Sequence, residues 1–275
     1  MDIFAPHYYN DFLCLKDKCH HNCCIGWEID IDEETLEFYK TKDDIIKNIS
    51  VDDTAHFILK DDRCPFLNQC GLCNIIINYG EENLCQICRD HPRFINEFDT
   101  RTEIGLGLAC EGAAKLILDN DLEIKKIGED NFILTPNLQE DSFFDKRQKL
   151  LNTDPQEIKS LLPRISVSSL ADFFRTLERL DSKWEFYLDS LKNRHENIND
   201  IKINDICKAK RLFSYFIFRH FHTYGLEFCL LCTYFILSIS GDIYDIARAF
   251  SAEIEYSDEN AERIINFFTY YRRSL

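Results

Sequence analysis

One short stretch decides how the N-terminal part of this chain folds: Cys14-Leu-Lys-Asp-Lys-Cys19-His-His-Asn-Cys23-Cys24-Ile-Gly-Trp27. Further groups follow at Cys64-Pro-Phe-Leu67, Cys70-x2-Cys73, Cys85-x2-Cys88 and Cys110-Glu111. Spacings of two or three residues place two sulfurs on one side of a turn or helix, where one ion or cluster can bridge them. Because ten of the 13 cysteines lie within the first 110 residues, the pattern predicts a thiolate-bound metal.

The predicted metal ligands are nine of these ten cysteines: Cys14, Cys19, Cys23, Cys24, Cys64, Cys73, Cys85, Cys88 and Cys110. We expect Cys19, one of the adjacent pair, Cys85 and Cys88 to converge, with the others nearby. The spacing leaves zinc and iron both open. Structural zinc sites usually show two regular pairs, whereas here the spacings are irregular and the adjacent Cys23 and Cys24 cannot easily both bind one tetrahedral ion. The bacterial ferredoxin run is absent too. Irregular spacing from separated segments slightly favours an iron–sulfur cluster over zinc.

The N-terminus shows no sign of export. Met1-Asp-Ile-Phe-Ala-Pro-His7 has neither the basic start nor the apolar run of a signal peptide, so we expect a cytoplasmic protein. A reducing compartment disfavours a disulfide framework. The longest apolar stretch, residues 228–239, is too short to span a bilayer, so no transmembrane segment is expected.

Composition excludes some classes of function. The chain has 275 residues, and 48 acidic residues against 32 basic ones give a net charge of −16. Phosphate contacts need clustered Lys and Arg, so no nucleic-acid partner is expected. With 45% hydrophobic residues, including 22 Phe, the chain is predicted to be folded rather than disordered.

The chain divides into three regions. Residues 1–120 carry the cysteine cluster, residues 121–165 form a connector with a possible hairpin, and residues 166–275 form an all-α region. The last region contains no proline, and its apolar residues recur at helical spacing. The predicted fold class is therefore mainly α. In it, a cysteine-rich metal-binding N-terminal region of loops and short helices packs on a C-terminal helical bundle.

Local signals place several elements. Helices are expected over 32–47, 81–90 and 112–118, from acidic first turns and a following proline. A strand over 122–127 turns into a second strand at 132–134. Helical apolar stripes run from Leu170 to Leu180 and from Leu212 to Phe221, and the expected N-caps are Ser168 and Asp258.

A set of motifs covers about the first 120 residues: Phe12-Leu-Cys14, Cys19-x3-Cys23-Cys24-x-Gly-Trp27, Cys64-x-Phe-Leu67, Gly71-Leu-Cys73, Gly80-Glu81-x2-Leu-Cys85-x2-Cys88-x3-Pro-Arg93 and Cys110-Glu111. Together they resemble the flagellin lysine-N-methylase family. A looser likeness is to cysteine-cluster proteins described as zinc- or iron-chelate-binding. The family resemblance implies an S-adenosylmethionine-dependent methyltransferase that modifies the ε-amine of flagellin lysines. It also implies a 4Fe–4S cluster held by these cysteines.

The sequence departs from that family at two places. Members usually read Cys-Pro-Glu at the last motif, where this chain has Cys110-Glu-Gly112, and commonly carry Tyr or Phe in place of His91. The radical S-adenosylmethionine signature is also missing, because Gly26 stands where its third cysteine belongs. Gly105 and Gly107 superficially resemble a dinucleotide-binding loop, but no buried strand precedes them, so we expect a glycine-bearing strand or turn leading to Cys110.

Arg93 is the candidate cofactor-binding residue, because its guanidinium matches a carboxylate of the cofactor or the substrate. The alternative role for Arg93 is a salt bridge at a helix end. His20 and His21 are expected to be exposed loop residues rather than ligands. Trp27 is expected to anchor the core beside the metal loop.

The helical region offers no comparable site. Cys229 and Cys232 share the spacing of Cys85 and Cys88, but their apolar neighbours predict a pair of small buried hydrophobes. His220 and His222 flank a phenylalanine and point to different faces of the expected helix.

Two classes of function remain open from the sequence. The first is an enzyme that methylates lysines of flagellin or another lysine-bearing protein, using S-adenosylmethionine and a 4Fe–4S cluster, with zinc as the alternative metal. The second is a non-catalytic zinc or iron–sulfur binding module with a helical partner-docking region. Acidic residues outnumber basic ones roughly two to one in the first 120 residues, which suits a cleft that attracts an ammonium group. A pocket between the cysteine loops and the helical region would favour the enzyme.

Overall fold

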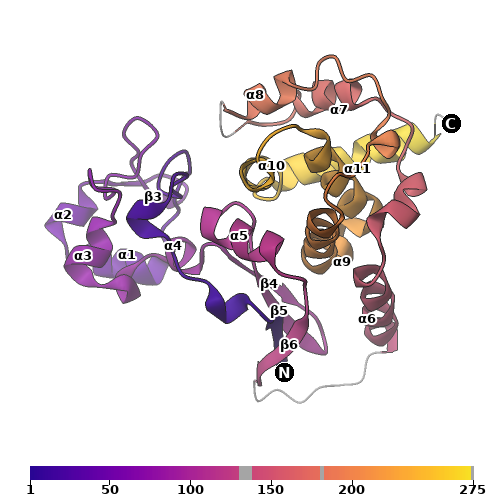
Figure 1. Cartoon of the computed structure of the whole chain (residues 1–275). Coiled ribbons are helices and arrows are strands. Elements are labelled where there is room, and N and C mark those ends of the chain that lie inside the picture. The colour runs from indigo at the N-terminus through magenta and orange to yellow at the C-terminus, as the bar shows by residue number, and fades with distance from the viewer. Residues whose placement is uncertain (130–137, 180–182, 274–275) are drawn as a thin grey trace.

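Helices dominate the computed structural model, which describes residues 1–129, 138–179 and 183–273 (Figure 1). The cysteine-bearing segments and a small sheet form the N-terminal part, and longer helices form the C-terminal part. The mainly-α prediction is therefore confirmed, but most of the sheet was not predicted. None of the helices in the described ranges combines the length and apolar character that crossing a membrane requires.

The sheet has four strands in the order β4-β5-β1-β6. β1 pairs in parallel with β5 and antiparallel with β6, and β4 pairs antiparallel with β5. The strands of this sheet and of a separate hairpin are β1 (Asp2–Pro6), β4 (Arg93–Glu97), β5 (Arg101–Leu106), β6 (Ile124–Glu129), and β2 (Ile49–Val51) with β3 (Ala55–Phe57). The strand expected over 122–127 is confirmed as β6, whereas its predicted partner at 132–134 lies outside the described residues.

Gly105 and Gly107 lie where the sheet approaches other side chains closely. A Cβ atom on Gly105 would lie 2.3 Å from Cζ of Phe94, and one on Gly107 would lie 2.7 Å from the hydroxyl oxygen of Tyr256. No side chain fits at such distances. Gly105 lies in β5 and Gly107 directly follows it, in the segment that leads to Cys110 as the sequence predicts, and both positions serve close packing.

The helices of the N-terminal part are short and interrupted. They are α1 (Glu33–Tyr39), α2 (Asp43–Ile46), α3 (Asn74–Tyr79), α4 (Gln86–Asp90) and α5 (Glu111–Asp119), with 3-10 helices at η1 (Tyr9–Asp11), η2 (Lys16–Lys18) and η3 (Glu81–Asn83). The helix predicted over 112–118 is confirmed as α5, and Asp32 caps α1 through the Thr35 N–H at 3.0 Å.

Two predicted helices are each divided in two. The helix expected over 32–47 breaks after α1, because the Thr41 hydroxyl donates to the Phe38 carbonyl at 2.7 Å and Lys42 is extended. The helix expected over 81–90 breaks because the Cys85 N–H donates to the Tyr39 hydroxyl at 3.1 Å instead of to a helical carbonyl. A tertiary contact therefore overrides local propensity there.

The C-terminal part is built from longer helices around an aromatic core. They are α6 (Leu138–Leu151), α7 (Val167–Phe174), α8 (Lys183–Asp189), α9 (Ile206–Ser238), α10 (Ile243–Ile254) and α11 (Asp258–Arg273), with η4 (Pro155–Leu161) and η5 (Ile198–Asp200). α9 is interrupted at Gly225, whose φ of 80° is left-handed. Both predicted apolar stripes face the core over the described residues, and Leu180 lies outside them.

Two predicted helix caps are wrong by one or two positions. Ser166, rather than Ser168, caps α7, and its hydroxyl accepts a backbone N–H of the first turn at 3.1 Å. Asp258 lies inside the first turn of α11, where the Ser257 hydroxyl accepts an N–H at 3.3 Å. In both helices, the serine oxygen three residues before a free N–H is the better placed acceptor.

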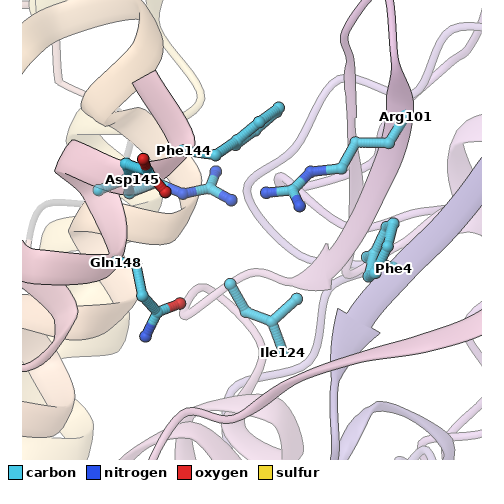
Figure 2. Close-up of a pocket in the computed structure, with 7 residues that line it drawn as sticks. Phe4, Arg101, Ile124, Phe144, Asp145 and Gln148 are labelled. Atoms are coloured by element: carbon cyan, nitrogen blue, oxygen red, sulfur yellow. The ribbon is translucent and has the colours of Figure 1, made fainter. Parts of the chain in front are cut away.

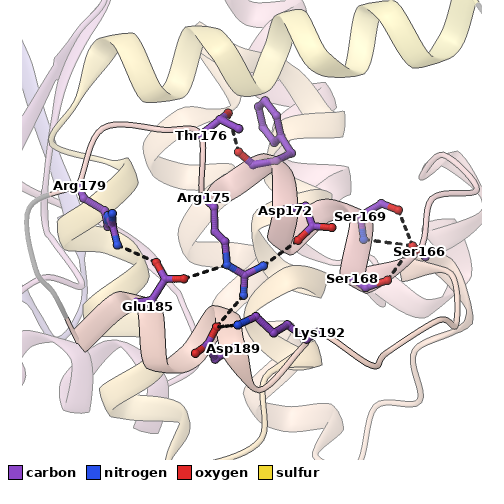
Figure 3. Close-up of polar contacts among 11 residues, drawn as sticks. Ser166, Ser168, Ser169, Asp172, Arg175, Thr176, Arg179, Glu185, Asp189 and Lys192 are labelled. Atoms are coloured by element: carbon purple, nitrogen blue, oxygen red, sulfur yellow. Dashed lines mark hydrogen bonds and ion pairs between the residues drawn. The ribbon is translucent and has the colours of Figure 1, made fainter.

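Charged side chains connect α7 to α8 (Figure 3). Arg175, at the end of α7, binds Asp172, Glu185 and Asp189 at 2.8, 2.9 and 3.1 Å. Arg179 adds a second ion pair to Glu185 at 2.7 Å. Because the ion pairs form a network, they hold the two short helices together better than isolated surface pairs would.

The molecule has two hydrophobic cores. The larger core joins the sheet and α5 to the C-terminal helices, and it includes Phe174 stacked on Phe235 with ring centroids 4.1 Å apart. The smaller core lies among the cysteine-bearing segments and contains Tyr39, Phe57 and Phe66. The cysteine-bearing region therefore has a packing centre of its own.

Candidate metal and substrate site

Thiols from separate segments gather around the smaller core. Five of them belong to it or pack against it: Cys24, Cys64, Cys73, Cys85 and Cys88. The Cys64 N–H donates to the Cys24 carbonyl at 2.8 Å, which joins the first and second cysteine segments. Cys23 is exposed next to Cys24. We call these six the inner thiols.

The inner thiols affect one another's ionisation. A hydrogen bond with Cys23, burial, and the charges of Cys23, Cys64 and Cys73 all raise the pKa of Cys24. The pKa of Cys88 is raised in the same way, by a hydrogen bond with Cys85, by burial, and by the charges of Cys85, Cys24 and Cys23. Such mutual repulsion requires the sulfurs to lie close together. A bound cation would relieve it.

In each adjacent or near-adjacent pair, the hydrogen bond between the two thiols lowers the pKa of one of them. The hydrogen bond from Cys24 lowers the pKa of Cys23, and the hydrogen bond from Cys88 lowers the pKa of Cys85. Because the thiolate is the form that binds metal, each pair offers one prepared ligand. Cys23 thus pairs with Cys24 and Cys85 with Cys88, while the expected convergence of Cys19 with these thiols stays a prediction.

A second group, the outer thiols, consists of Cys14, Cys19 and Cys110. Burial and the charges of Cys23 and Cys14 raise the pKa of Cys110. The sulfur of Cys19 donates to Oε2 of Glu111 at 3.6 Å, and burial raises its pKa to about 12, with a further contribution from Glu111. Cys19 therefore contacts the His21 carbonyl and Glu111, and the charge of Cys110 also acts on it.

The donor chemistry suits a soft, thiophilic metal, because nine sulfurs from four segments are available. Among the residues that the structure describes, however, no three His, Cys, Asp or Glu side chains stand in an arrangement ready to hold a metal ion. The structure thus gathers the thiols without fixing a coordination sphere. The nine-cysteine ligand set stays a prediction.

A groove of about 440 Å³ lies beside the inner thiols, between the cysteine-bearing segments and the C-terminal part. Its lining residues are Asp30, Ile31, Asp32, Thr54, Gln86, Ile87, Asp90, His91, Arg93 and Tyr256. Three carboxylates make its rim acidic, and hydrogen bonds from the N–H groups of Gln86 and Thr35 lower the pKa of Asp32 against the effect of burial. The groove can attract a cationic side chain.

Arg93 stands at the start of β4 and lines this groove. Its guanidinium carbon lies 5.4 Å from the ring centroid of Phe12 and 5.9 Å from that of Tyr9. The described part of the chain places no carboxylate in an ion pair with it. Arg93 is exposed, so its planar donors are free to meet a carboxylate of a ligand.

His91 lies two residues before Arg93 in the same groove. Burial, Arg219 and Arg93 lower the pKa of His91 to about 4, so its ring is neutral at neutral pH. Its Nε2 atom is buried and has no hydrogen-bond partner within the described ranges. A neutral ring here avoids placing a third positive charge beside two arginines.

A buried polar network lies behind the groove, and the sequence did not reveal it. The fully buried Glu255 carboxylate accepts from Tyr215 at 2.7 Å and His220 at 2.6 Å, and pairs with Arg219 at 3.1 Å. His220 was not expected to form a site, and its contact here is structural, because it holds a buried carboxylate. The pair Tyr215 and Arg219, four residues apart on α9, was the only sequence signal.

Arg219 links this network to the groove. Its guanidinium carbon lies 5.2 Å from the ring centroid of Tyr256, and Tyr256 packs edge-on against Trp27 at 5.1 Å. Trp27, expected to anchor the core, instead bridges the first cysteine loop to the C-terminal part. Tyr256, in the groove wall, is therefore held by Arg219 on one side and by Trp27 on the other.

The remaining candidates behave largely as predicted. His20 is exposed and pairs with Glu111 at 3.1 Å, and the half-buried His21 lies 3.4 Å from Asp245. Cys229 and Cys232 are fully buried in the larger core, as expected of packing residues.

Comparison with known proteins gives a consistent picture. Proteins named lysine-N-methylase from Salmonella choleraesuis (strain SC-B67) and Salmonella typhimurium (strain LT2) are each 28% identical over 166 residues, which cover 54% of this chain. The chain spans about 40% of their length. A flagellar biosynthetic protein, FliU, from Salmonella muenchen is 28% identical over 142 residues, covering 46% of this chain and 82% of FliU.

No protein-family model matches the chain, and no solved structure matches it significantly. The resemblance carried by the cysteine motifs is nonetheless confirmed, and about half of this chain is similar to lysine-N-methylases.

Proposed function

We propose that this chain is a protein-lysine N-methyltransferase that uses S-adenosylmethionine and a cysteine-bound iron–sulfur cluster, with a flagellin lysine as substrate. The groove supports this most directly, because residues next to Cys85 and Cys88 in the chain line it together with Tyr256 of the C-terminal part, and three carboxylates lie in its wall. The names of the relatives point to the same reaction and to the flagellum. A non-catalytic metal module would not need such a groove.

The residues of the groove suit a lysine substrate. An ammonium group has no lone pair, so lysine must lose a proton before its nitrogen can attack a methyl group. Asp30, Asp32 and Asp90 attract the ammonium, and the apolar wall at Ile31 and Tyr256 favours its neutral form once water is displaced. At the acidic rim the ammonium would give its proton to water, and the neutral amine would then be placed to accept the methyl group.

Arg93 is the residue that we assign to the amino-acid end of S-adenosylmethionine. Its planar guanidinium can hold a carboxylate through two parallel hydrogen bonds, and no internal carboxylate among the described residues competes for it. When bound, S-adenosylmethionine supplies an electrophilic methyl group, and the cluster supplies redox-active iron. The inner thiols would hold that iron.

The main test is methyl transfer under anaerobic conditions. We expect protein purified without oxygen to be brown, to contain iron, and to transfer labelled methyl groups from S-adenosylmethionine to flagellin. Added chelator should abolish both the colour and the transfer. Colourless, zinc-containing protein without transfer would instead support the metal-module alternative.

A second test isolates Arg93. The Arg93→Lys variant keeps the charge but loses the planar fork, so S-adenosylmethionine binding should weaken about tenfold while iron content is unchanged. Equilibrium dialysis measures the binding without requiring turnover. Arg89→Lys, at an exposed arginine outside the groove lining, is the matched control and should bind normally. Equal binding in both variants would remove Arg93 from the cofactor site.

A further inference from the structure

The strand that begins in the groove lies at an edge of the sheet. β4 is the outermost strand beside β5, and its first residue, Arg93, lines the groove. An exposed strand edge pairs readily with another chain, and proteins often block it with a proline or a bulge. β4 contains no proline, and its register with β5 is regular over all five residues. Its edge therefore stays able to accept a further strand.

The hydrogen bonds at the two ends of the hairpin show which backbone groups face that edge. The Gly107 N–H donates to the Pro92 carbonyl at 2.6 Å, and the Phe98 N–H donates to the Arg101 carbonyl at 3.0 Å. In an antiparallel pair such bonds recur at every second residue. Three residues between these ends therefore point their N–H and C=O groups away from β5: Arg93, Ile95 and Glu97. Within the described ranges, no hydrogen bond involves these backbone groups.

The edge strand is held in place on one face and at its turn. The Asn96 side chain donates to the carbonyls of Phe218 and Arg219 in α9, at 3.4 and 3.3 Å. At the turn, Figure 2 shows Arg101, the first residue of β5, reaching toward Phe144 of α6 beside a cavity of about 270 Å³. The guanidinium carbon lies 3.4 Å from the ring centroid of Phe144. A partner chain therefore meets a preformed edge, which favours binding.

The side chains along the edge indicate what pairs with it. Ile95, in the middle, is 62% exposed and lies opposite Ile104 of β5, so an apolar residue in an added strand would extend this row. Glu97 is exposed at the far end of β4. At the near end, three carboxylates lie in the groove: Asp30, Asp32 and Asp90. The middle of the edge therefore favours an apolar residue in the partner, and both ends favour a basic one.

We propose that β4 binds the substrate as an added β-strand, so that an extended segment of the lysine-bearing protein leads its lysine into the groove. The identity of the partner rests on the proposed function. The segment would carry an apolar residue opposite Ile95, a basic residue opposite Glu97 and the target lysine beside Arg93. Arg93 would not repel this lysine, because the carboxylate of S-adenosylmethionine would balance its charge. The substrate segment is therefore extended rather than helical.

The main test is a backbone N-methyl scan of a short peptide. The probe is Ac-Lys-Thr-Val-Thr-Lys-NH₂, whose residues read the same in both directions, so that parallel and antiparallel binding present the same side chains to β4. In an added strand, only every second N–H faces β4. N-methylation at valine and at the following threonine should therefore differ. One change should weaken binding at least about tenfold, and the other less than about twofold.

Fluorescence anisotropy of the labelled peptide with the full chain measures this binding. Equal effects of the two N-methyl groups would overturn the inference, because an added strand must use alternate N–H groups. The absence of saturable binding would overturn it as well.

A variant of the edge tests the same contact from the side of the protein. Ile95→Pro removes the outward N–H and keeps the bonds to β5, since proline is tolerated on an edge strand where its nitrogen faces solvent. It should bind the peptide at least about tenfold more weakly. Ile95→Thr keeps the N–H and is the matched control, with a loss of no more than about threefold. Equal binding by the two variants would contradict the inference. Trp184 fluorescence checks folding, and if Ile95→Pro is unfolded the peptide scan decides.

Methyl transfer distinguishes this inference from the proposed function. Nα-acetyl-lysine amide is too short to add a strand, so Ile95→Pro should methylate it at the unmodified rate while losing activity toward the peptide. Absence of transfer to both substrates by the unmodified chain would contradict the proposed function and leave the alternating pattern of peptide binding intact. Transfer to the peptide that is insensitive to N-methylation and to Ile95→Pro would keep the proposed function and overturn the added strand.

A second copy of this chain is the competing occupant of the edge. Sedimentation of the unmodified chain and of Ile95→Pro tests for it. A monomer in both cases agrees with a substrate strand. A dimer that becomes monomeric in Ile95→Pro would show that β4 pairs with itself, and would overturn the inference.

Discussion

The two parts of the molecule contain Cys-x2-Cys pairs of identical spacing in opposite surroundings. Cys85 and Cys88 hydrogen-bond to each other, and the charges of Cys23 and Cys24 in another segment raise the pKa of Cys88. Cys229 and Cys232 are fully buried among aromatic and aliphatic side chains, and burial raises the pKa of both well above its ordinary value. The spacing therefore indicates only that two sulfurs can lie on one face of a helix. Whether they bind metal or pack in a core depends on the side chains around them.

The cores differ in the same way. The larger core contains many stacked aromatic rings and has enough buried apolar area to support itself. The smaller core has few members, and two of its buried residues are the cysteines Cys64 and Cys85. We infer that the N-terminal part depends on whatever its thiols bind, while the C-terminal part does not.

The largest expected effect tests that dependence. In the double variant Cys85→Ser, Cys88→Ser, iron content should fall to background and methyl transfer should be lost, because a hydroxyl is a poor substitute for a soft thiolate. Metal binding of this kind contributes about 10 kcal/mol to folding in small domains, so the smaller core should loosen. The larger core should persist, and the fluorescence of the buried Trp184 should remain native-like.

Cys70→Ser is the matched control for that experiment. Cys70 lies in the same region but is exposed and outside the predicted ligand set. The control should keep its iron and its activity. Iron retained in the double variant, or equal losses in both proteins, would show that the inner thiols do not form the metal site.

The next effect concerns the larger core. Glu255→Gln removes the charge that balances Arg219 inside the buried network, and it should lower the free energy of unfolding by about 3–5 kcal/mol. Urea unfolding followed by Trp184 fluorescence measures this loss. Glu262→Gln, at an exposed position, should change stability by no more than about 0.5 kcal/mol. A loss below about 1 kcal/mol in Glu255→Gln would mean that the network contributes little.

The sequence predicted what local chemistry controls and missed what distant contacts create. Apolar spacing correctly predicted the stripes of α7 and α9, whereas the ligand set drawn from the cysteine motifs stays a prediction. The sheet was missed because β1 has only five residues and pairs with β5, about one hundred residues away. A periodic pattern within a short stretch of sequence cannot indicate a strand partner that lies so far away in the chain.

In the candidate site, too, the residues with a local motif were predicted and those placed by tertiary contacts were missed. Arg93 was predicted from its motif and does line the groove, but Tyr256 was not, because it approaches from the turn between α10 and α11 at the other end of the chain. The Glu255 network was also missed, since its members are ordinary residues of α9 and of the C-terminal cap of α10 until packing brings them together. Residues that act through tertiary burial leave almost no local signal.

Cys229→Ser gives a smaller effect and separates the two cysteine pairs directly. The new hydroxyl would be buried at a site where the sulfur donates only to the Phe216 carbonyl at 3.3 Å, so the cost should be about 1–3 kcal/mol. Iron content should match that of the unmodified protein. Thermal unfolding and iron analysis test both statements, and a loss of iron beyond the loss of folded protein would contradict a packing role.

The smallest effect concerns His91, where the two parts meet. Burial, Arg219 and Arg93 lower its pKa from 6.5 to about 4. The unfolded chain therefore binds more protons than the folded chain between these values, and stability must fall as the pH drops from about 6.5 toward 4. Because His91 is only half-buried, solvent reduces this effect. We expect the free energy of unfolding to fall by about 1 kcal/mol between pH 7 and pH 5.

His91→Phe removes this titration and leaves every other ionisable group in place. Between pH 7 and pH 5, the free energy of unfolding of the variant should fall by about 1 kcal/mol less than that of the unmodified protein. Urea unfolding at both pH values measures the difference. His56→Phe is the control, because that histidine is half-exposed on β3 and lies outside the groove lining. Its pH dependence should match that of the unmodified protein. Identical pH dependence in all three proteins would mean that His91 is accessible to protons in the folded state. The contact between the cysteine-bearing region and the helical part would then be looser than its packing around Tyr256 indicates.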